Sequence, residues 1–393
     1  MYFDVIIAGG SIAGLICARE IASNQNSVLV LEEDYEIGTP EHCGGLVSME
    51  GLMELGIIPF RNIYGSLIEK AEIFAPDGNS FSIDVTKQKI VEISRRELDK
   101  QLAFQAQNNG AIIKTHASFQ EFSDNTVKTN DGEFKCKLFV DARGVSSIIH
   151  KDRTGVLLSA QYEVYANWIQ KGKIEVYFDQ TKYPGFFAWI IPSGDGKGKI
   201  GVAGKGINTS VAINKFLESR KEYSIIRKIF APIWIKGPVE KFVDNGIVIV
   251  GDAAGQAKPT TAGGIYSSGM GGMLAGKSIS KFLKTNNILD LHEYQQKWFI
   301  KFGKEFEKQS TARKLLEKLD NNSINKLFEL ITPDIVKEIS EKDDFDFHAS
   351  SIIKLLGIRN SLSTLHTLFR GELTKFLDQR YRNSKQGIND VMG

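Results

Sequence analysis

The sequence predicts an α/β fold: a doubly wound parallel-sheet domain interleaved with an antiparallel β-sheet domain and followed by a helical C-terminal region. Three observations predict it. Two short apolar runs near the N-terminus flank a glycine turn and a helical stretch, the order of a βαβ unit. Strand-like runs fill residues 65–91 and 156–206. From residue 286 the chain is charged, amphipathic and poor in glycine, which is typical of helices.

The first element is a buried strand, Asp4–Ala8, that ends in a glycine turn and opens directly into a helix reaching about residue 23. The turn carries Gly9, Ser11, Ala13 and Gly14. Such a turn directs backbone N–H groups and the positive end of a helix dipole at one place, which suits a pyrophosphate. Ser11 stands where G-x-G-x-x-G has its second glycine, but it is small and its hydroxyl can bind a phosphate.

The second strand, Val28–Leu31, ends at Glu32. This acid lies near the expected ~20 residues after the glycines, where a carboxylate can accept both hydroxyls of an adenosine ribose. Strand, turn, helix, strand and acid occur in the right order. The N-terminal segment is therefore predicted to be a Rossmann-type dinucleotide-binding unit.

The later elements alternate between the two predicted domains. Pro76-Asp77-Gly78-Asn79 separates two runs of alternating polarity and predicts a hairpin. We expect helices over 94–109, 210–230 and within 262–284, short strands over 111–140, and a buried strand at Ile247–Val250. The dinucleotide-binding domain then comprises residues 1–64, 92–152 and 242–285, the β-sheet domain 65–91 and 153–241, and the helical region 286–393.

Composition excludes several classes of function. The 49 basic and 47 acidic residues nearly cancel, so bulk charge gives no argument for a nucleic-acid partner. Cys17, Cys43 and Cys136 are scattered and odd in number, which favours a reducing cytoplasm over a disulfide framework. The six histidines lack metal-ligand spacing, so no metal is expected. We find no signal peptide and no apolar run of the ~18 residues that a transmembrane helix needs.

A second glycine element, Gly251-Asp252-Ala253-Ala254-Gly255, follows the strand at residues 247–250. With the N-terminal turn, it resembles the FAD-binding fold of the p-hydroxybenzoate hydroxylase class over roughly residues 1–285. The resemblance implies that Asp252 contacts the ribityl chain of FAD. It also places Arg95, in Ser94-Arg95-Arg96-Glu97-Leu98-Asp99, beside the cofactor, together with Ala13 and Ala117. Arg143 stands where this class usually has an aspartate, which weakens the case for hydroxylase-type use of NADPH.

Two motifs resemble the geranylgeranyl reductase subfamily. Cys43-Gly44-Gly45-Leu46 resembles its C-G-G loop beside the isoalloxazine, and residues 184–192 resemble its Y-x-W-x-F-P strand. The resemblance makes Phe187, Trp189 and Ile191 candidate substrate residues and Cys43 the candidate catalytic residue. It also implies that the flavin edge meets Gly44, Gly45 and the sequence Gly263-Gly264-Ile265.

The implied function is FAD-dependent saturation of isoprenoid C=C bonds in a polyprenyl lipid: archaeal-type membrane lipid, prenyl diphosphate or prenyl quinone. Such a reaction requires a hydride, a proton and a dry apolar pocket. Three alternatives remain open, namely an aromatic hydroxylase, a flavin halogenase and a flavoprotein that passes electrons to a quinone. The electron donor, a ferredoxin or NAD(P)H, leaves no signal in the sequence.

The charged tail offers a route to the lipid. Residues 352–356 and 365–370 combine apolar positions with neighbouring basic residues, a pattern found where a helix lies on a membrane surface. The competing interpretation is that these faces pack against the protein itself. We therefore expect a cytoplasmic protein, and peripheral contact with the inner face of the membrane is an open hypothesis.

Overall fold

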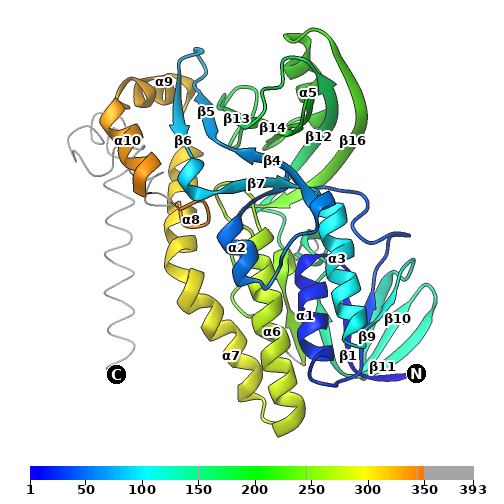
Figure 1. The fold of residues 1–393 in the computed structure, drawn as a ribbon. Coiled ribbons are helices and arrows are strands. Elements are labelled where there is room, and N and C mark those ends of the chain that lie inside the picture. The colour runs from blue at the N-terminus through cyan, green and yellow to red at the C-terminus, as the bar shows by residue number, and fades with distance from the viewer. Residues whose placement is uncertain (149–150, 245, 343, 349–393) are drawn as a thin grey trace, which may run out of the picture.

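The computed structural model describes residues 1–348 apart from 149–150, 245 and 343. The predicted lipid-facing segments, 352–356 and 365–370, lie outside the described residues. The described chain confirms the predicted α/β fold class. Figure 1 shows a strand-rich layer at the top, with α1, α3 and α6 arranged below it beside the N-terminal sheet.

The N-terminal sheet has the strand order β17-β18-β11-β1-β2-β8, in which β18 to β8 form a parallel core and β17 pairs antiparallel with β18. In this core β1 pairs in parallel with both β2 and β11, so the glycine turn leaves the sheet next to its centre. β9 and β10 extend β11 as an antiparallel meander. The strands are β1 (Tyr2–Ala8), β2 (Val28–Leu31), β8 (Ile112–Lys114), β9 (Phe119–Ser123), β10 (Thr126–Thr129), β11 (Gly132–Asp141), β17 (Val243–Asp244) and β18 (Ile247–Ile249).

Buried apolar side chains cover both faces of this sheet. On one face, Val5 and Ile7 of β1 join the core formed with α1 (Ile12–Ala22), α3 (Arg95–Asn108), α6 (Ile265–Thr285) and α7 (Leu289–Trp298). On the other, Ile6 and Ala8 pack among aromatic residues of the meander. A strand buried on both faces has a continuous apolar sequence instead of an alternating one, which explains the run at residues 5–8.

The second sheet has seven strands in the order β16-β12-β15-β14-β13-β5-β6. Its neighbours pair antiparallel except β13 and β5, which run parallel. The predicted hairpin at residues 76–79 is confirmed as the β5–β6 pair. The strands are β5 (Lys70–Phe74), β6 (Ser80–Asp84), β12 (Val156–Ala166), β13 (Lys173–Tyr177), β14 (Ala188–Gly194), β15 (Lys197–Gly204) and β16 (Tyr223–Trp234).

A small third sheet, β3-β7-β4, was not predicted. It consists of β3 (Leu46–Ser48), β7 (Ile90–Ile93) and β4 (Tyr64–Ile68), and β7 runs directly into Ser94, the N-cap of α3. The Cys43 loop leads into β3. The third sheet therefore connects two of the predicted site segments. The short helices α2 (Met49–Glu54) and α4 (Val145–Ile148) follow β3 and β11 along the chain.

The prediction of one helix over residues 210–230 is wrong. α5 spans only Thr209–Glu218, and residues 223–234 form β16. β16 pairs with β12 along most of its length. Ile225, Ile226 and Ile229 are β-branched and favour a strand, and the pairing with β12 then decides the outcome.

The described part of the C-terminal region is helical, as predicted. It contains α7, a π-turn (Phe299–Gly303), α8 (Lys304–Leu316), α9 (Asn321–Glu329) and α10 (Pro333–Lys342). Phe328 of α9 meets Phe81 of β6 at 5.2 Å between ring centroids, and Ser340 of α10 accepts a hydrogen bond from the Asp84 N–H. These helices therefore pack on the β5–β6 hairpin.

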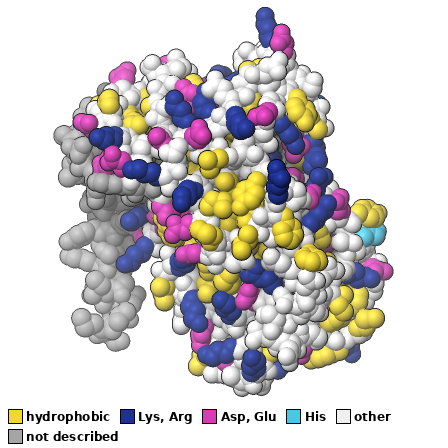
Figure 2. All heavy atoms as spheres, in the orientation of Figure 1, with side chains coloured by type: hydrophobic (Ala, Val, Ile, Leu, Met, Phe, Trp, Pro, Cys, Tyr) yellow, Lys and Arg dark blue, Asp and Glu magenta, His cyan; other side chains and the backbone are white. Residues whose placement is uncertain are grey.

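Among the described residues, none of the helices combines enough length and apolar character to cross a bilayer. Apolar side chains do gather on one face, in the middle of the view in Figure 2. Large exposed apolar residues concentrate between α2 and β4, where Ile58 is 82% exposed; the others there are Met53, Phe60, Tyr64 and Leu67.

Candidate functional site

The glycine turn after β1 has the backbone that a close helix–strand approach requires. Gly9 has a φ of +113°, and a Cβ there would lie 2.3 Å from the carbonyl oxygen of Ala142. A Cβ at Gly14 would lie 2.1 Å from the carbonyl oxygen of Gly9. Ser11, by contrast, has a φ of −107°, which any residue can adopt. The first and third glycines of the motif are therefore required here, and the second is replaceable.

α1 begins without a side-chain cap, because the hydroxyl of its N-cap residue Ser11 bonds elsewhere. The Ser11 Oγ donates to Oδ2 of Asp99 at 3.3 Å and accepts from Nη2 of Arg95 at 3.1 Å. The first N–H groups of α1 thus keep their capacity to bind an anion. The helix start and the Arg95 guanidinium form one donor-rich region around Ser11.

Glu32 ends β2 and accepts two backbone hydrogen bonds. Its Oε2 accepts from the Gly10 N–H at 2.7 Å and its Oε1 from the Asp34 N–H at 3.0 Å. Burial raises the pKa of the Glu32 carboxyl, although these two bonds oppose the rise. Ala117 is buried beside it and donates its N–H to the Glu32 carbonyl oxygen at 2.8 Å. The predicted ribose end of the site is therefore assembled from β2 and the segment after β8.

Arg95 is the first residue of α3 and lies buried against Asp99. Its Nη2 is 2.9 and 3.1 Å from the two Asp99 oxygens. Burial works against the charged guanidinium, but Asp99 and the neighbouring Cys43 thiol favour it, and the net result is a raised pKa for Arg95. The buried Arg95 Nε has no hydrogen-bond partner among the residues that the structure describes. Because such donors are rarely left unsatisfied, this atom fits a ligand acceptor.

Asp252 follows Gly251 in a short 3-10 turn after β18. Burial raises the pKa of the Asp252 carboxyl, whereas the Ser268 hydroxyl and the charge of Arg95 lower it. The Ser268 Oγ donates to Asp252 Oδ1 at 3.1 Å. A Cβ at Gly251 would lie 2.8 Å from the Cβ of Ala13, so the turn that carries Asp252 lies against the first turn of α1.

α6 has a second uncapped helix start, with a Cβ at its N-cap Gly264 lying 3.1 Å from Oδ1 of Asp252. α6 begins at Ile265 with Gly264 as its N-cap, and no side chain caps it. A Cβ at Gly272 of α6 would lie 2.2 Å from the Ala13 carbonyl oxygen, and one at Gly251 would lie 2.8 Å from the Ala13 Cβ. The turn at Gly251 and helix α6 therefore both lie against Ala13 of α1, although they are far from α1 in the chain. Two bare helix N-termini reinforce the anion-binding character of the site.

The Cys43 loop meets the predicted substrate strand directly. Gln161 Nε2 donates to the Cys43 carbonyl oxygen at 3.2 Å, and Trp189 Nε1 donates to Gln161 Oε1 at 3.2 Å. A Cβ at Gly44 would lie 2.8 Å from Cδ1 of Ile191. The two motifs of the subfamily resemblance, separated widely in the sequence, are therefore in contact.

Phe187 completes an apolar cluster next to this contact. It lies just before β14, stacks on Phe186 at 4.1 Å between ring centroids and meets the edge of Trp189 at 6.1 Å. Ala262, the residue before Gly263, packs against the same cluster. An apolar wall thus extends from the Cys43 loop to the glycine pair at the start of α6.

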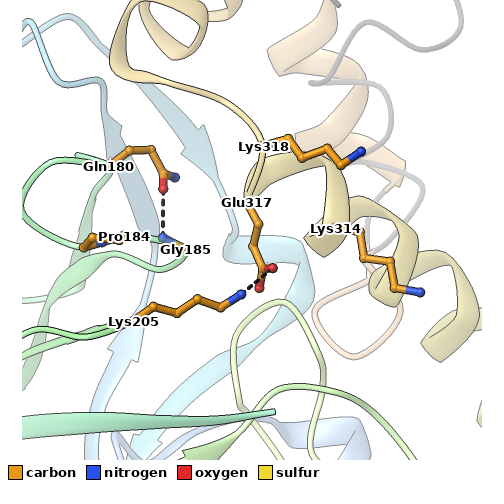
Figure 3. Close-up of a pocket in the computed structure, with 7 residues that line it drawn as sticks. All are labelled: Gln180, Pro184, Gly185, Lys205, Lys314, Glu317 and Lys318. Atoms are coloured by element: carbon orange, nitrogen blue, oxygen red, sulfur yellow. Dashed lines mark hydrogen bonds and ion pairs between the residues drawn. The ribbon is translucent and has the colours of Figure 1, made fainter. Parts of the chain in front are cut away.

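A cavity of about 360 Å³ lies where α8 meets the turn before Phe187. It is lined by Gln180, Pro184, Gly185, Lys205, Lys314, Glu317 and Lys318 (Figure 3). Gln180 accepts the Gly185 N–H at 2.8 Å, and Lys205 pairs with Glu317 at 2.7 Å. The lining contains none of the predicted site residues. The Lys205–Glu317 ion pair joins the end of β15 to the end of α8 beside this cavity.

Two polar residues of the site, Asp99 and Gln161, were not among the predicted site residues, although Asp99 ends the segment that carries Arg95. Asp99 could have been found from its i,i+4 spacing to Arg95, which puts both side chains on one helix face. Gln161 lies on β12 and has no sequence signal. Arg143, the departure from the hydroxylase pattern, is held by Asp141 at 2.8 Å and lies over the Phe119 ring at 4.0 Å.

The sequence is also similar to reductases from two archaea. A digeranylgeranylglycerophospholipid reductase from Methanothermobacter thermautotrophicus is 30% identical over 368 residues, 87% of this chain and 94% of that protein. One from Methanosphaera stadtmanae is 30% identical over 369 residues, 86% of this chain and 91% of that protein. No protein-family model matches the chain.

Solved structures confirm the fold. A geranylgeranyl bacteriochlorophyll reductase-like protein from Thermoplasma acidophilum superposes with a TM-score of 0.82 at 21% identity, covering 94% of this chain and 99% of that one. A flavin-dependent brominase has a TM-score of 0.65 at 14% identity, covering 96% and 100%. The fold is thus shared with flavoproteins of several activities. By the extent of its similarity to the two archaeal reductases, the chain belongs to the family of digeranylgeranylglycerophospholipid reductases.

Proposed function

We propose that this protein is an FAD-dependent reductase that saturates isoprenoid C=C bonds of a polyprenyl lipid. The observation that carries the proposal is the contact of the Cys43-Gly44 loop with Ile191, and through Gln161 with Trp189. Glu41, two residues before Cys43, accepts the Arg95 backbone N–H, so this contact lies beside the start of α3. A cofactor-facing loop against an apolar wall is what reduction of an unactivated alkene requires. The names of the family's members support the geranylgeranyl chains of archaeal-type membrane lipid as the substrate.

The residues fit FAD. The starts of α1 and α6 offer uncapped N–H groups for the pyrophosphate and the flavin, and Glu32 and Asp252 offer carboxylates for the ribose and the ribityl chain. The unpartnered Nε of Arg95 offers a further donor. When bound and reduced, FAD supplies a hydride.

The dry apolar pocket and the proton would be provided by residues of the chain itself. Phe187, Trp189 and Ile191 would hold the isoprenoid chain and exclude water from the reacting bond. Cys43 is the half-buried thiol at the contact, whereas Cys17 and Cys136 are fully buried in the core. We assign Cys43 to positioning the alkene or delivering the proton to its second carbon.

Cys43→Ser tests this assignment. We expect the variant to bind FAD normally, shown by its visible spectrum, and to saturate lipid about tenfold more slowly or worse, because the hydroxyl is a far weaker acid than the thiol. Wild-type saturation rates with normal FAD content would remove Cys43 from the mechanism.

The hydroxylase alternative makes a separate prediction: NADPH oxidation with oxygen uptake that a phenolic substrate stimulates. Arg143 contributes no carboxylate where that class uses one, and it is paired internally with Asp141. We therefore expect no phenol-stimulated oxygen uptake. The physiological donor, a ferredoxin or NAD(P)H, is identified by testing which of them reduces the bound flavin under anaerobic conditions.

Peripheral membrane contact is part of the proposal, since the substrate is a lipid. The exposed apolar side chains of residues 53–67, with the exposed Arg61 among them, provide a surface suited to a bilayer interface. Liposome flotation tests it. Wild-type protein should float with anionic vesicles, and an Ile58→Asp/Phe60→Asp variant should remain in the dense fraction. Equal flotation would place the contact elsewhere.

A further inference from the structure

A buried ionic triad lies beneath the Cys43 loop. Lys199 of β15 has a side chain only 3% exposed, with its Nζ 2.7 Å from Oε1 of Glu41 and 2.9 Å from Oε1 of Glu92. Both carboxylates are also buried. None of these residues belongs to a motif, and the proposed chemistry leaves all three unused.

Each member of the triad comes from a different part of the site. Glu41 lies two residues before Cys43, and the same Oε1 that accepts from Lys199 also accepts the backbone N–H of Arg95 at 3.0 Å. Glu92 belongs to β7, which leads into α3. One ammonium group therefore joins the second sheet, the Cys43 loop and the start of the Arg95 helix.

The loop is in direct contact with this strand pair. Lys199 is the cross-strand partner of Ile191, so their side chains share one face of the sheet. Ile191 packs under Gly44, and a Cβ at Gly45 would lie 3.1 Å from the Lys199 Nζ. Gly45 has a φ of +81° and would also place a Cβ 2.2 Å from the Ile93 carbonyl oxygen. The loop is thus seated on the ammonium with no space for a side chain between them.

A triad of this kind is poorly explained as a stabilising device. Removing three charges from water is costly, and well-packed apolar replacements of buried ionic groups are often as stable or more so. What ionic groups provide is a fixed geometry, because each hydrogen bond has a direction. The geometry fixed here is that of the Cys43 loop and the Arg95 backbone relative to the strand of Ile191.

We propose that Lys199, with Glu41 and Glu92, is a positioning residue that sets the Cys43 loop and the start of α3 at their working distance from the substrate strand. This inference rests on the proposed function for its catalytic readout. Its structural readout, the accessibility of the Cys43 thiol, stands apart from that function.

The test uses the full chain as purified and three variants. Lys199→Met removes the ammonium. Lys199→Met/Glu41→Gln/Glu92→Gln removes all three charges, so that no unpaired ion is left buried and the protein retains a route to folding. Lys171→Met is the control, since it breaks an exposed pair with Asp195. Each protein is treated with iodoacetamide, and the alkylated cysteines are identified by mass spectrometry. The kcat and KM for lipid reduction are then measured.

We expect Cys43 to be alkylated about tenfold faster in both Lys199 variants, because the loop loses its anchor. We expect kcat to fall about tenfold or more with retained FAD, because small misplacements at a reacting centre are costly. Cys17 and Cys136 are 0% exposed and should stay unmodified, which reports that the core is intact. The control should match wild type.

Wild-type alkylation and kcat in the all-neutral variant would overturn the proposal, because the charges would then be dispensable for positioning. Modification of all three cysteines in Lys199→Met, together with full recovery in the all-neutral variant, would also overturn it and reduce the triad to a folding requirement. If wild-type protein reduces no lipid, the proposed function fails, and the Cys43 alkylation rates still decide the positioning role.

Discussion

Replacing Arg95 with Met removes the cation that faces Asp99 and leaves a buried carboxylate without its partner. The two side chains are 11% and 6% exposed and lie 2.9 Å apart. Breaking a buried pair from one side costs about 3–5 kcal/mol. For a cooperative unit of about 340 residues, roughly the part of the chain that the structure describes, this corresponds to a fall in Tm of roughly 4–7 °C. Arg96→Met is the matched control, since Arg96 is 37% exposed and its pair with Glu97 is worth about 0–1 kcal/mol.

The Arg95 effect has a defined pH dependence. Burial raises the pKa of Asp99 in the folded protein, and Arg95 limits that rise. Without the guanidinium the folded-state pKa rises further above its unfolded value. The folded state then loses stability as pH rises through this pKa and recovers it as the carboxyl protonates at lower pH. The deficit against wild type should therefore be larger at about pH 8 than at about pH 5.

The assay is thermal unfolding of FAD-free protein at both pH values, followed by titration with FAD. We expect Arg95→Met to melt below Arg96→Met at each pH, with the wider gap at the higher one, and to bind FAD more weakly because the Nε donor is lost. A variant that melts with the control at both pH values would refute the account of the Arg95–Asp99 pair. A gap that widens on acidification would refute the assigned direction of the Asp99 pKa.

Two further predictions concern the cofactor scaffold. Gly272→Val places a Cβ 2.2 Å from the Ala13 carbonyl oxygen, which is too close for van der Waals contact. The variant should therefore separate α1 from α6, lower Tm and weaken FAD binding. An unchanged Tm would mean that the two helices do not approach so closely. Asp252→Asn removes the carboxylate predicted to accept from the ribityl chain and should raise the Kd for FAD about 10- to 150-fold, since a charged hydrogen bond is worth about 1.5–3 kcal/mol. Equal Kd values from flavin fluorescence quenching would remove Asp252 from the cofactor site.

The local parts of the fold could be predicted from the sequence because they depend on neighbouring residues. The turn at Gly9 and Gly14, the Ser94 cap and the hairpin at residues 76–79 each have a short-range physical signature. Residues 223–230 were wrongly predicted as helix because the local sequence does not reveal that β12 is their partner strand. The small β3-β7-β4 sheet was missed for the same reason.

The site residues also divide into those with a local sequence signal and those that depend on distant partners. Cys43, Arg95, Trp189 and Asp252 lie within motifs and could be proposed from the sequence, and their roles stay predictions. Gln161 and Lys199 could not be found, because each is a single polar residue on a strand whose meaning depends on what the fold places opposite it. Buried polar groups acquire a role only from their partners, and those partners are distant in sequence.

The central claim is that the chain saturates isoprenoid lipid with a flavin. The most direct measurement is to load the protein with FAD, reduce it with dithionite under anaerobic conditions, add digeranylgeranylglycerophospholipid and follow the lipid by mass spectrometry. The account predicts a series of products, each heavier by two hydrogen atoms for every double bond reduced, that form about tenfold more slowly or worse with Cys43→Ser protein. A protein that carries fully reducible FAD yet leaves the mass of the lipid unchanged would contradict it.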